Sequence, residues 1–177
     1  MNSLNFEFLR ESYEELANLG GFAEAYAYSD QEACLLKLRK YGEFLVKAVY
    51  VRQHLAFDVR DKFHDLLTDH SFKSITPPVV QDKLHLLRLN GNDAAHGDLQ
   101  PLSNSKIIEL IREAYGLGKW LLVSGGKLQA GGFTPWVDIT KPSSINQDQT
   151  QSESVAKENK ATKKKLEQQE ALMKKLL

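Results

Sequence analysis

One segment of the 177-residue chain holds most of the side chains that could do chemistry. Within residues 84–97 the sequence LHLLRLNGNDAAHG places an arginine, two asparagines and a histidine around a glycine. An arginine in such a cluster can bind a phosphate, and a histidine can act as a general acid or base near neutral pH. We therefore take Arg88, Asn90, Asn92 and His96 as the candidate polar cluster, with Arg88 and His96 as the candidate catalytic residues.

The same cluster also has a structural interpretation. Asn92 and His96 stand four residues apart and can share a helix face, and the small side chains of Ala94 and Ala95 allow close packing. An arginine at a junction of two helices can bind the carbonyl groups that a helix end leaves free. We expect the segment to join the fourth and fifth predicted helices, with Gly91 interrupting the helical conformation. The sequence leaves open whether the cluster is a polar staple or a phosphate-binding pocket.

Most motifs that mark catalytic or nucleotide-binding sites are absent. The chain has no phosphate loop, no G-x-G-x-x-G, no H-E-x-x-H and no G-x-S-x-G sequence. Acidic residues near His64 and His70 scatter around the expected helix, so we predict no metal site, and nothing indicates a cofactor. Arg60 and His64 stand four apart and would suit a ribonuclease pair, but we interpret them as part of an ordinary solvent-exposed helix.

The composition indicates a folded cytoplasmic protein. Hydrophobic residues make up 42% of the chain, which is enough to build a core. The first residues include acids and an arginine where a signal peptide is apolar, and no apolar run of about 18 residues occurs, so we expect no membrane association. Cys34 is the only cysteine, which excludes a disulfide framework and every cysteine-cluster metal site and fits a reducing compartment.

The formal net charge of zero conceals an uneven distribution. Residues 143–177 hold seven Lys and five acids, so residues 1–142 carry a small acidic excess. A dedicated phosphate binder usually has a basic excess, and any nucleic-acid contact must therefore be local. We predict a helical domain over 1–140, a flexible polar linker over 141–156 and a charged helix over 157–177. Because that helix ends without a stop signal, we expect the natural polypeptide to continue into further domains.

Helical periodicity predicts about five helices within the first 140 residues and no β-sheet, hence an all-α antiparallel helical bundle. The second of these helices has a core stripe of Leu35, Leu38, Leu45 and Val49, with Gly42 allowing a neighbouring helix to approach. Residues 133–139 are expected to form a short strand or a strapping coil. The predicted helices are one from Phe6 to a stop at Gly20-Gly21, one from a Ser29–Glu32 capping box to about Gln53, a short one around Val59–Leu67, one from Pro78 to about Leu89, and one from an N-cap at Ser103 to Leu121.

The segment LRLNGNDAAHG resembles the L-R-x-x-G-N-x-A-A-H signature of a helical domain found at the N-terminus of many type I restriction endonuclease R subunits and related DEAD/DEAH helicase proteins. That domain is related to the HEPN helical-bundle superfamily. The resemblance extends to the opening F-x-F-L-x-x-x-Y-x-E-L, to Ala25–Val49 with Y-S-D-x-x-A-C-L-x-K-L-R-x-x-x-E, and to Ile107–Leu121. It covers about residues 4–124 and implies a HEPN-like fold.

The resemblance also implies a function. The parent protein would be a type I site-specific deoxyribonuclease, an ATP-dependent DNA-cleaving R subunit whose nuclease and ATPase residues are not in this chain. In HEPN ribonucleases an arginine, a polar residue, four to six further residues and a histidine build a metal-free site at a dimer interface. Here seven residues separate Arg88 from His96, which is the upper end of that spacing, and the expected interruption of the helix at Gly91 departs from the pattern. The resemblance therefore favours a non-catalytic N-terminal accessory domain, whose partners are other domains and subunits of a restriction-modification complex, with weak or indirect DNA contact.

Two alternatives remain open at this point. The chain could be a stand-alone, metal-independent HEPN-type ribonuclease that uses Arg88 and His96. It could instead be a self-assembly module that forms a homodimer through the second and fifth predicted helices. These alternatives differ in whether RNA is cleaved and in whether the chain associates with itself.

Overall fold

Six α-helices and one short 3-10 helix form the part of the chain that the structure describes. This computed structural model describes residues 1–97, 100–128 and 132–142, and a compact unit spans Met1–Ile139. Those residues contain no β-strand, which confirms the all-α prediction. Most of the predicted linker and all of the predicted helix at 157–177 lie outside the described residues. The helices are η1 (Glu7–Leu9), α1 (Glu14–Tyr26), α2 (Gln31–Arg52), α3 (Phe63–Thr68), α4 (His70–Ile75), α5 (Pro78–His96) and α6 (Asn104–Ser124).

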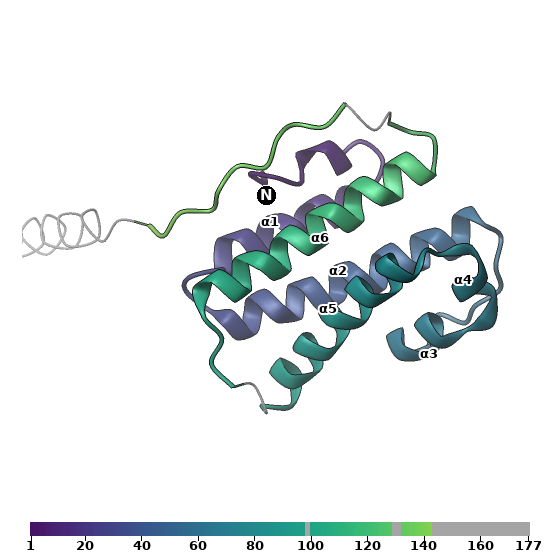
Figure 1. The fold of residues 1–177 in the computed structure, drawn as a ribbon, viewed down its shortest axis with the longest axis horizontal. Helices are drawn as coiled ribbons and strands as arrows, with labels where there is room; N and C mark the ends of the chain where they lie inside the picture. The colour runs from purple at the N-terminus through teal and green to yellow at the C-terminus, as the bar shows by residue number, and fades with distance from the viewer. Residues whose placement is uncertain (98–99, 129–131, 143–177) are drawn as a thin grey trace, which may run out of the picture. The chain divides into compact units, whose positions relative to one another are not determined.

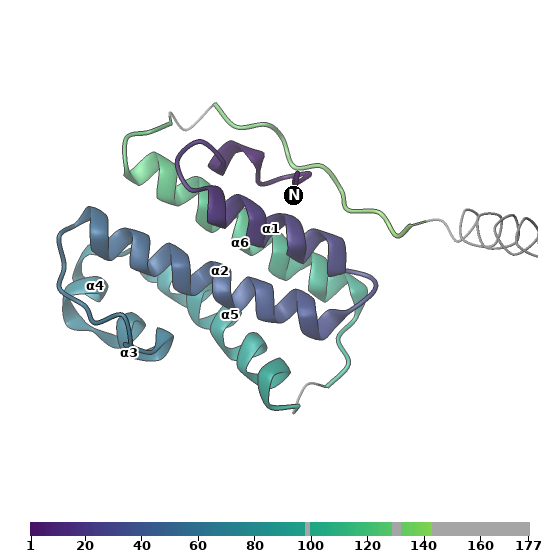
Figure 2. The ribbon, with the colours of Figure 1, turned by 180° about the vertical axis from the view of Figure 1, so that it is seen from behind.

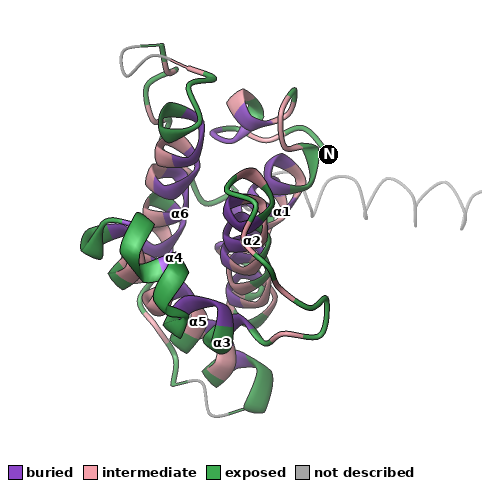
Figure 3. Ribbon diagram, turned by 90° about the vertical axis from the view of Figure 1, so that its right-hand side faces the viewer, coloured by how far each residue is buried: buried purple, intermediate pink, exposed green. Residues whose placement is uncertain are grey.

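The helix α2 is the central element of the bundle, because it packs against α1, α3, α5 and α6. Figure 1 shows the chain path, and in the reverse view of Figure 2 α1 and α2 lie in front of α6 and α5. The short connection 27–30 makes α1 and α2 antiparallel neighbours. The predicted core stripe Leu35, Leu38, Leu45 and Val49 is buried, and buried residues lie on the helix sides that face the interior (Figure 3).

The start of α2 differs from the expected capping box. Asp30, not Ser29, is the N-cap: its carboxylate accepts a hydrogen bond from the Ala33 amide at 2.9 Å. Both residue types can cap a helix. The Ser29 hydroxyl instead points back to the carbonyl of Ala25 at 3.5 Å. The helix therefore begins one residue later than the Ser29–Glu32 pattern indicates.

The glycine pair at positions 20 and 21 does not end the first helix. The structure has α1 running through both residues to Tyr26, and the opening segment around Phe6 forms only a 3-10 turn. A methyl group added at Gly20 would overlap the ring of Phe6. Gly20 is therefore present because the Phe6 ring packs directly on the helix backbone, and the prediction of a helix stop was wrong.

The middle of the chain forms two short helices where one was predicted. Phe63 is buried at the start of α3 and its ring lies against Gly42, as expected for a glycine that admits a neighbour. Val59 is 84% exposed and does not join the core. Asp69 ends α3 and begins α4, because its carboxylate accepts hydrogen bonds from the amides of Ser71 and Phe72.

The last two long helices begin at the predicted residues. The helix α5 starts at Pro78, and Ser103 caps α6 by accepting a hydrogen bond from the Lys106 amide at 3.2 Å. The end of α5 was predicted wrongly. It continues past Leu89 to His96 and closes on Gly97, whose backbone is left-handed.

Residues 133–139 form a strapping coil that holds the N-terminal segment. The Asn5 side chain donates to the Val137 carbonyl oxygen at 2.9 Å and accepts from the Val137 amide at 2.7 Å. The Tyr115 hydroxyl donates to the Thr134 carbonyl oxygen at 2.7 Å. Of the two expectations for this segment, the coil is the one observed.

A buried carboxylate fixes the N-terminus to α1. Glu24 accepts hydrogen bonds from the Ser3 hydroxyl at 2.7 Å, the Leu4 amide at 2.7 Å and the Asn5 amide at 2.8 Å. Only 9% of this residue is exposed. The acid therefore supplies the acceptors that two backbone amides near the core would otherwise lack.

Two further findings concern the Cys34 thiol and the hydropathy of the helices. Burial raises the pKa of the Cys34 thiol to about 12, so the thiol stays protonated and unreactive near neutral pH. Among the described helices, none combines the length and hydropathy that a membrane crossing requires.

Replacing Glu24 by alanine tests the N-terminal anchor. We expect Glu24→Ala to lower the free energy of unfolding by about 3 kcal/mol, because two amides lose their acceptor. The exposed Glu11 provides the control, and Glu11→Ala should change stability by less than about 0.5 kcal/mol. Urea denaturation measures both, and equal stabilities for the two variants would contradict the anchoring role.

Candidate functional site

The polar segment singled out in the sequence lies inside a continuous helix. Gly91 does not interrupt α5, which runs from Pro78 to His96. Arg88, Asn92 and His96 are spaced by four residues, and each such step turns a helix by about 40°. The three side chains therefore lie on one side of α5: the shared face of Asn92 and His96 was expected, and the continuous helix adds Arg88 to it.

That side of α5 borders a solvent-open pocket of about 410 Å³ between α2, α5 and the segment that leads into α3. All three spaced residues line it. The complete lining is Arg39, Glu43, Val59, Arg60, Asp61, Lys62, Phe63, His64, Arg88, Asn92 and His96. We call this the α2–α5 pocket.

Arg39 of α2 joins the two helices across the pocket. Its Nε donates a hydrogen bond to Oδ1 of Asn92 at 2.8 Å. The contact depends on Gly91, since a methyl group added there would collide with Cβ of Arg39 and lie 3.0 Å from the Leu35 carbonyl oxygen. Asn92 thus acts as a staple, but it joins α2 to α5, whereas the sequence led us to expect a staple between the fourth and fifth predicted helices, which are α5 and α6.

Arg88 differs from Asn92 in its hydrogen bonding. The residue is partly buried, and its Nε atom is buried without a hydrogen-bond acceptor among the described residues. An unpaired buried donor costs free energy, and because this atom is closed to solvent, an anion in the pocket would meet the other nitrogens of the guanidinium. Among the four residues of the cluster, Arg88 is the one with a buried donor that lacks an acceptor within the described residues.

Of the other residues singled out in the sequence, Arg60, His64 and His96 line the pocket and Asn90 does not. His96 is exposed at the pocket, near the end of α5. Asn90 does not line it, because its amide donates to the Leu86 carbonyl oxygen of the same helix at 2.8 Å. Arg60 and His64 do line the pocket, although Arg60 precedes α3 and does not share a helix face with His64.

The pocket has an excess of positive charge. Four lining side chains are basic, Arg39, Arg60, Lys62 and Arg88, against two acids, Glu43 and Asp61. Glu43 is already paired with Lys47 at 2.8 Å and Arg60 with Asp58 at 3.0 Å, which leaves three cations and one acid in the lining. Burial and then the charge of Arg88 lower the pKa of the neighbouring His85. The arrangement suits binding of an anion such as a phosphate.

Arg39 is the site residue that sequence reasoning missed. It stands in α2, 53 positions before its partner Asn92, and no local motif connects the two. Two signals were present in the sequence: Gly91, whose missing side chain marks a close approach by another element, and the Y-S-D-x-x-A-C-L-x-K-L-R-x-x-x-E stretch, whose arginine is Arg39. For metals, the described residues contain no group of three or more His, Cys, Asp or Glu side chains that could hold an ion.

Comparison of the chain with protein-family models, curated proteins and solved structures gives no match in any of the three. The resemblance to the restriction-subunit domain therefore stays a prediction from the residues that carry it. Function must be argued from the pocket.

Two glycines inside helices provide a matched test of the α2–α5 contact. Gly91→Ala should lower the free energy of unfolding by about 1–3 kcal/mol, because the added methyl group has no room beside Arg39. Gly116 of α6 faces only the end of the Lys83 side chain, at 3.7 Å, so Gly116→Ala should stabilise by about 0.5–1 kcal/mol. Urea denaturation compares them, and an alanine tolerated equally well at both sites would contradict the close approach.

Proposed function

We propose that this chain is a non-catalytic accessory domain that binds the phosphate backbone of nucleic acid through the α2–α5 pocket. The observation that carries the proposal is that the Arg88 guanidinium lines a pocket with a basic excess. A phosphate placed there would accept from the guanidinium and lie near the other basic side chains. Backbone contacts of this kind do not distinguish sequences.

The setting of this activity follows from the resemblance. We propose that the domain works in the R subunit of a type I restriction-modification system, beside the domains that translocate and cut DNA. Its formal net charge of zero favours a weak contact, since no large basic surface adds to the pocket. A domain of this kind helps to place DNA or a partner subunit and leaves cleavage to the rest of the parent protein.

Loss of one arginine should weaken binding. We expect the 177-residue chain to bind fluorescein-labelled DNA with a Kd of about 10–100 µM at low salt, and Arg88→Gln to raise that Kd about tenfold. Binding should also weaken about tenfold between about 50 and 200 mM salt if two phosphates are contacted. Fluorescence anisotropy measures both effects.

Arg112→Gln is the matched control for this experiment. Arg112 is an exposed arginine that pairs with Asp138 at 3.2 Å and does not line the pocket. The same loss of one charge there should leave the Kd within about twofold, because exposed charges contribute little individually. If the two variants bind equally well, the pocket is not the binding site.

A second candidate function is the metal-independent ribonuclease. The observation that favours it is that Arg88 and His96 line one pocket, together with His64. In such a reaction one histidine takes the proton of the ribose 2′-hydroxyl, whose oxygen attacks the adjacent phosphorus. The bond to the 5′-oxygen breaks, and a protonated histidine supplies the proton that this leaving oxygen needs. Arg88 would stabilise the charge on the phosphate oxygens.

The ribonuclease candidate has its own test. The chain is incubated with RNA in EDTA, beside DNA of the same sequence, which lacks the 2′-hydroxyl. If the candidate is correct, RNA is cut, DNA stays intact, and His96→Ala lowers the rate at least about a hundredfold. RNA that stays intact, or cleavage that survives in His96→Ala, rejects it while leaving the phosphate-binding proposal in place.

A further inference from the structure

A second concave surface lies on the other side of the Glu43–Lys47 ion pair. It consists of two adjoining hollows, of about 620 and 250 Å³, which share Phe44 and Lys47. We call their combined surface the α1–α2 groove. The larger hollow is lined by Tyr13, Phe44, Lys47, Ala48, Val51, Arg52, Gly125 and Lys127, and the smaller one adds Glu15, Leu19, Lys40 and Glu43.

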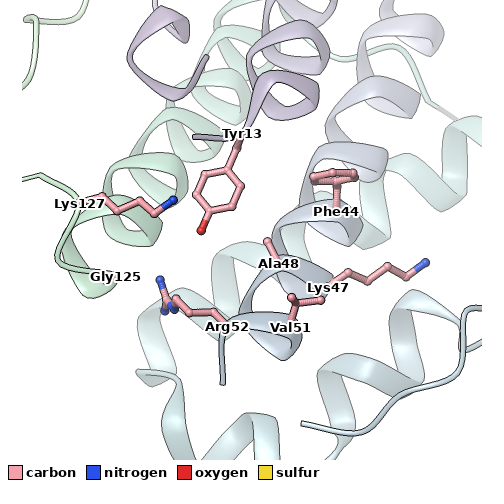
Figure 4. Close-up of a pocket in the computed structure, with 8 residues that line it drawn as sticks. All are labelled: Tyr13, Phe44, Lys47, Ala48, Val51, Arg52, Gly125 and Lys127. Atoms are coloured by element: carbon pink, nitrogen blue, oxygen red, sulfur yellow. The ribbon is translucent and has the colours of Figure 1, made fainter. Parts of the chain in front are cut away.

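The floor of the groove is an exposed apolar stripe on α2. Phe44, Ala48 and Val51 are spaced by four and three residues, so they lie on one face of the helix. Phe44 is 40% exposed and Val51 is 65% exposed. Tyr13 continues the apolar surface, and Figure 4 shows its ring between Lys127 on one side and α2 on the other. A stripe with this spacing is what one helix presents to another.

Cations border the stripe. Lys40, Lys47, Arg52 and Lys127 all line the groove. The ammonium group of Lys127 lies over the Tyr13 ring, 4.9 Å from its centroid. The only acids in the lining are Glu15 and Glu43, and Glu43 is paired with Lys47. The groove therefore combines an apolar floor with a basic edge.

Hydrogen bonds of Arg52 hold the basic edge in place. Its guanidinium donates to the Leu121 carbonyl oxygen at 2.8 Å and to the Ser124 hydroxyl at 3.0 Å, which ties α2 to the end of α6. Its Nε atom is buried without an acceptor among the described residues. The end of α6, and with it Lys127, is thus held beside the stripe by contacts within the unit.

The charge pattern argues against a second copy of this chain as the occupant. Two copies related by a twofold axis would place the same stripe against itself, with cations facing cations. Like charges across an interface are unfavourable, whereas acidic side chains would be complementary to this edge.

We propose that the α1–α2 groove binds an acidic amphipathic helix of a partner protein. Its apolar face packs on Phe44, Ala48 and Val51, and its Asp or Glu side chains pair with Lys40 and Lys127. This proposal does not rest on phosphate binding, because the pocket that binds phosphate is lined by other cations. The domain would then have two binding surfaces that adjoin at Glu43 of α2.

Two synthetic helical peptides test the proposal with the full 177-residue chain. Both carry the same face of leucine and alanine, and they differ only in having glutamate or lysine on the flanks. We expect saturable binding of the fluorescein-labelled glutamate peptide in fluorescence anisotropy, and no binding of the lysine peptide. Val51→Glu should weaken binding about tenfold or more, since it places a carboxylate on the stripe. Lys127→Glu should also weaken it, without changing the stripe.

Val79→Glu is the matched control, because Val79 of α5 is 59% exposed and lies outside the groove. It should bind the glutamate peptide like the unchanged chain, as should Arg88→Gln. Three results would overturn the proposal: no binding of the glutamate peptide, equal binding of both peptides, or full binding by Val51→Glu. Sedimentation of the chain as a dimer that Val51→Glu dissociates would overturn it in favour of a second copy. None of these results bears on DNA affinity, so failure here is distinct from failure of phosphate binding.

Discussion

The close approach of α2 and α5 at Gly91 is the constraint on which the candidate site depends. Without a side chain at that position, Arg39 crosses the surface of α5 and reaches Asn92. A larger residue would push the helices apart and move Arg39 away from Arg88, because packed helices meet at a distance that the contacting side chains set. The glycine thus links the packing of the core to the charge of the pocket.

Neighbouring polar residues of α5 have different roles. Asn92 is a staple, since it takes up the Arg39 donor. Asn90 is satisfied within α5 and takes no part in the pocket. Arg88 lines the pocket among other cations, and that position supports the phosphate-binding proposal. One polar segment therefore provides both the contact that holds two helices together and the group that we propose to bind a phosphate.

The zero net charge of the chain is compatible with two basic surfaces, because each exposed charge interacts mainly with groups close to it. The interaction of exposed charges falls off over about 10 Å in salt solution, so a ligand responds to the groups around it and not to the total for the chain. The α2–α5 pocket and the α1–α2 groove are each lined by more cations than acids. The Glu43–Lys47 pair lies where the two surfaces adjoin, and within this pair one negative and one positive charge neutralise each other. Two different binding activities on one central helix are consistent with this arrangement.

The sequence by itself determined the all-α class, the buried stripe of α2 and the starts of α5 and α6, because these follow from nearby residues: the spacing of Leu35, Leu38, Leu45 and Val49, the proline at 78 and the cap at Ser103 all act within a few positions. The same local signals also identified Arg88, Asn92 and His96. Only the tertiary structure decided what the glycines do. Gly20 and Gly91 suggest helix ends in the sequence, yet both lie inside helices where Phe6 and Arg39 pack on the backbone. Arg39 could not be predicted, since the contact that brings it to the site joins residues far apart in the chain, and such contacts follow from how helices pack and not from periodicity.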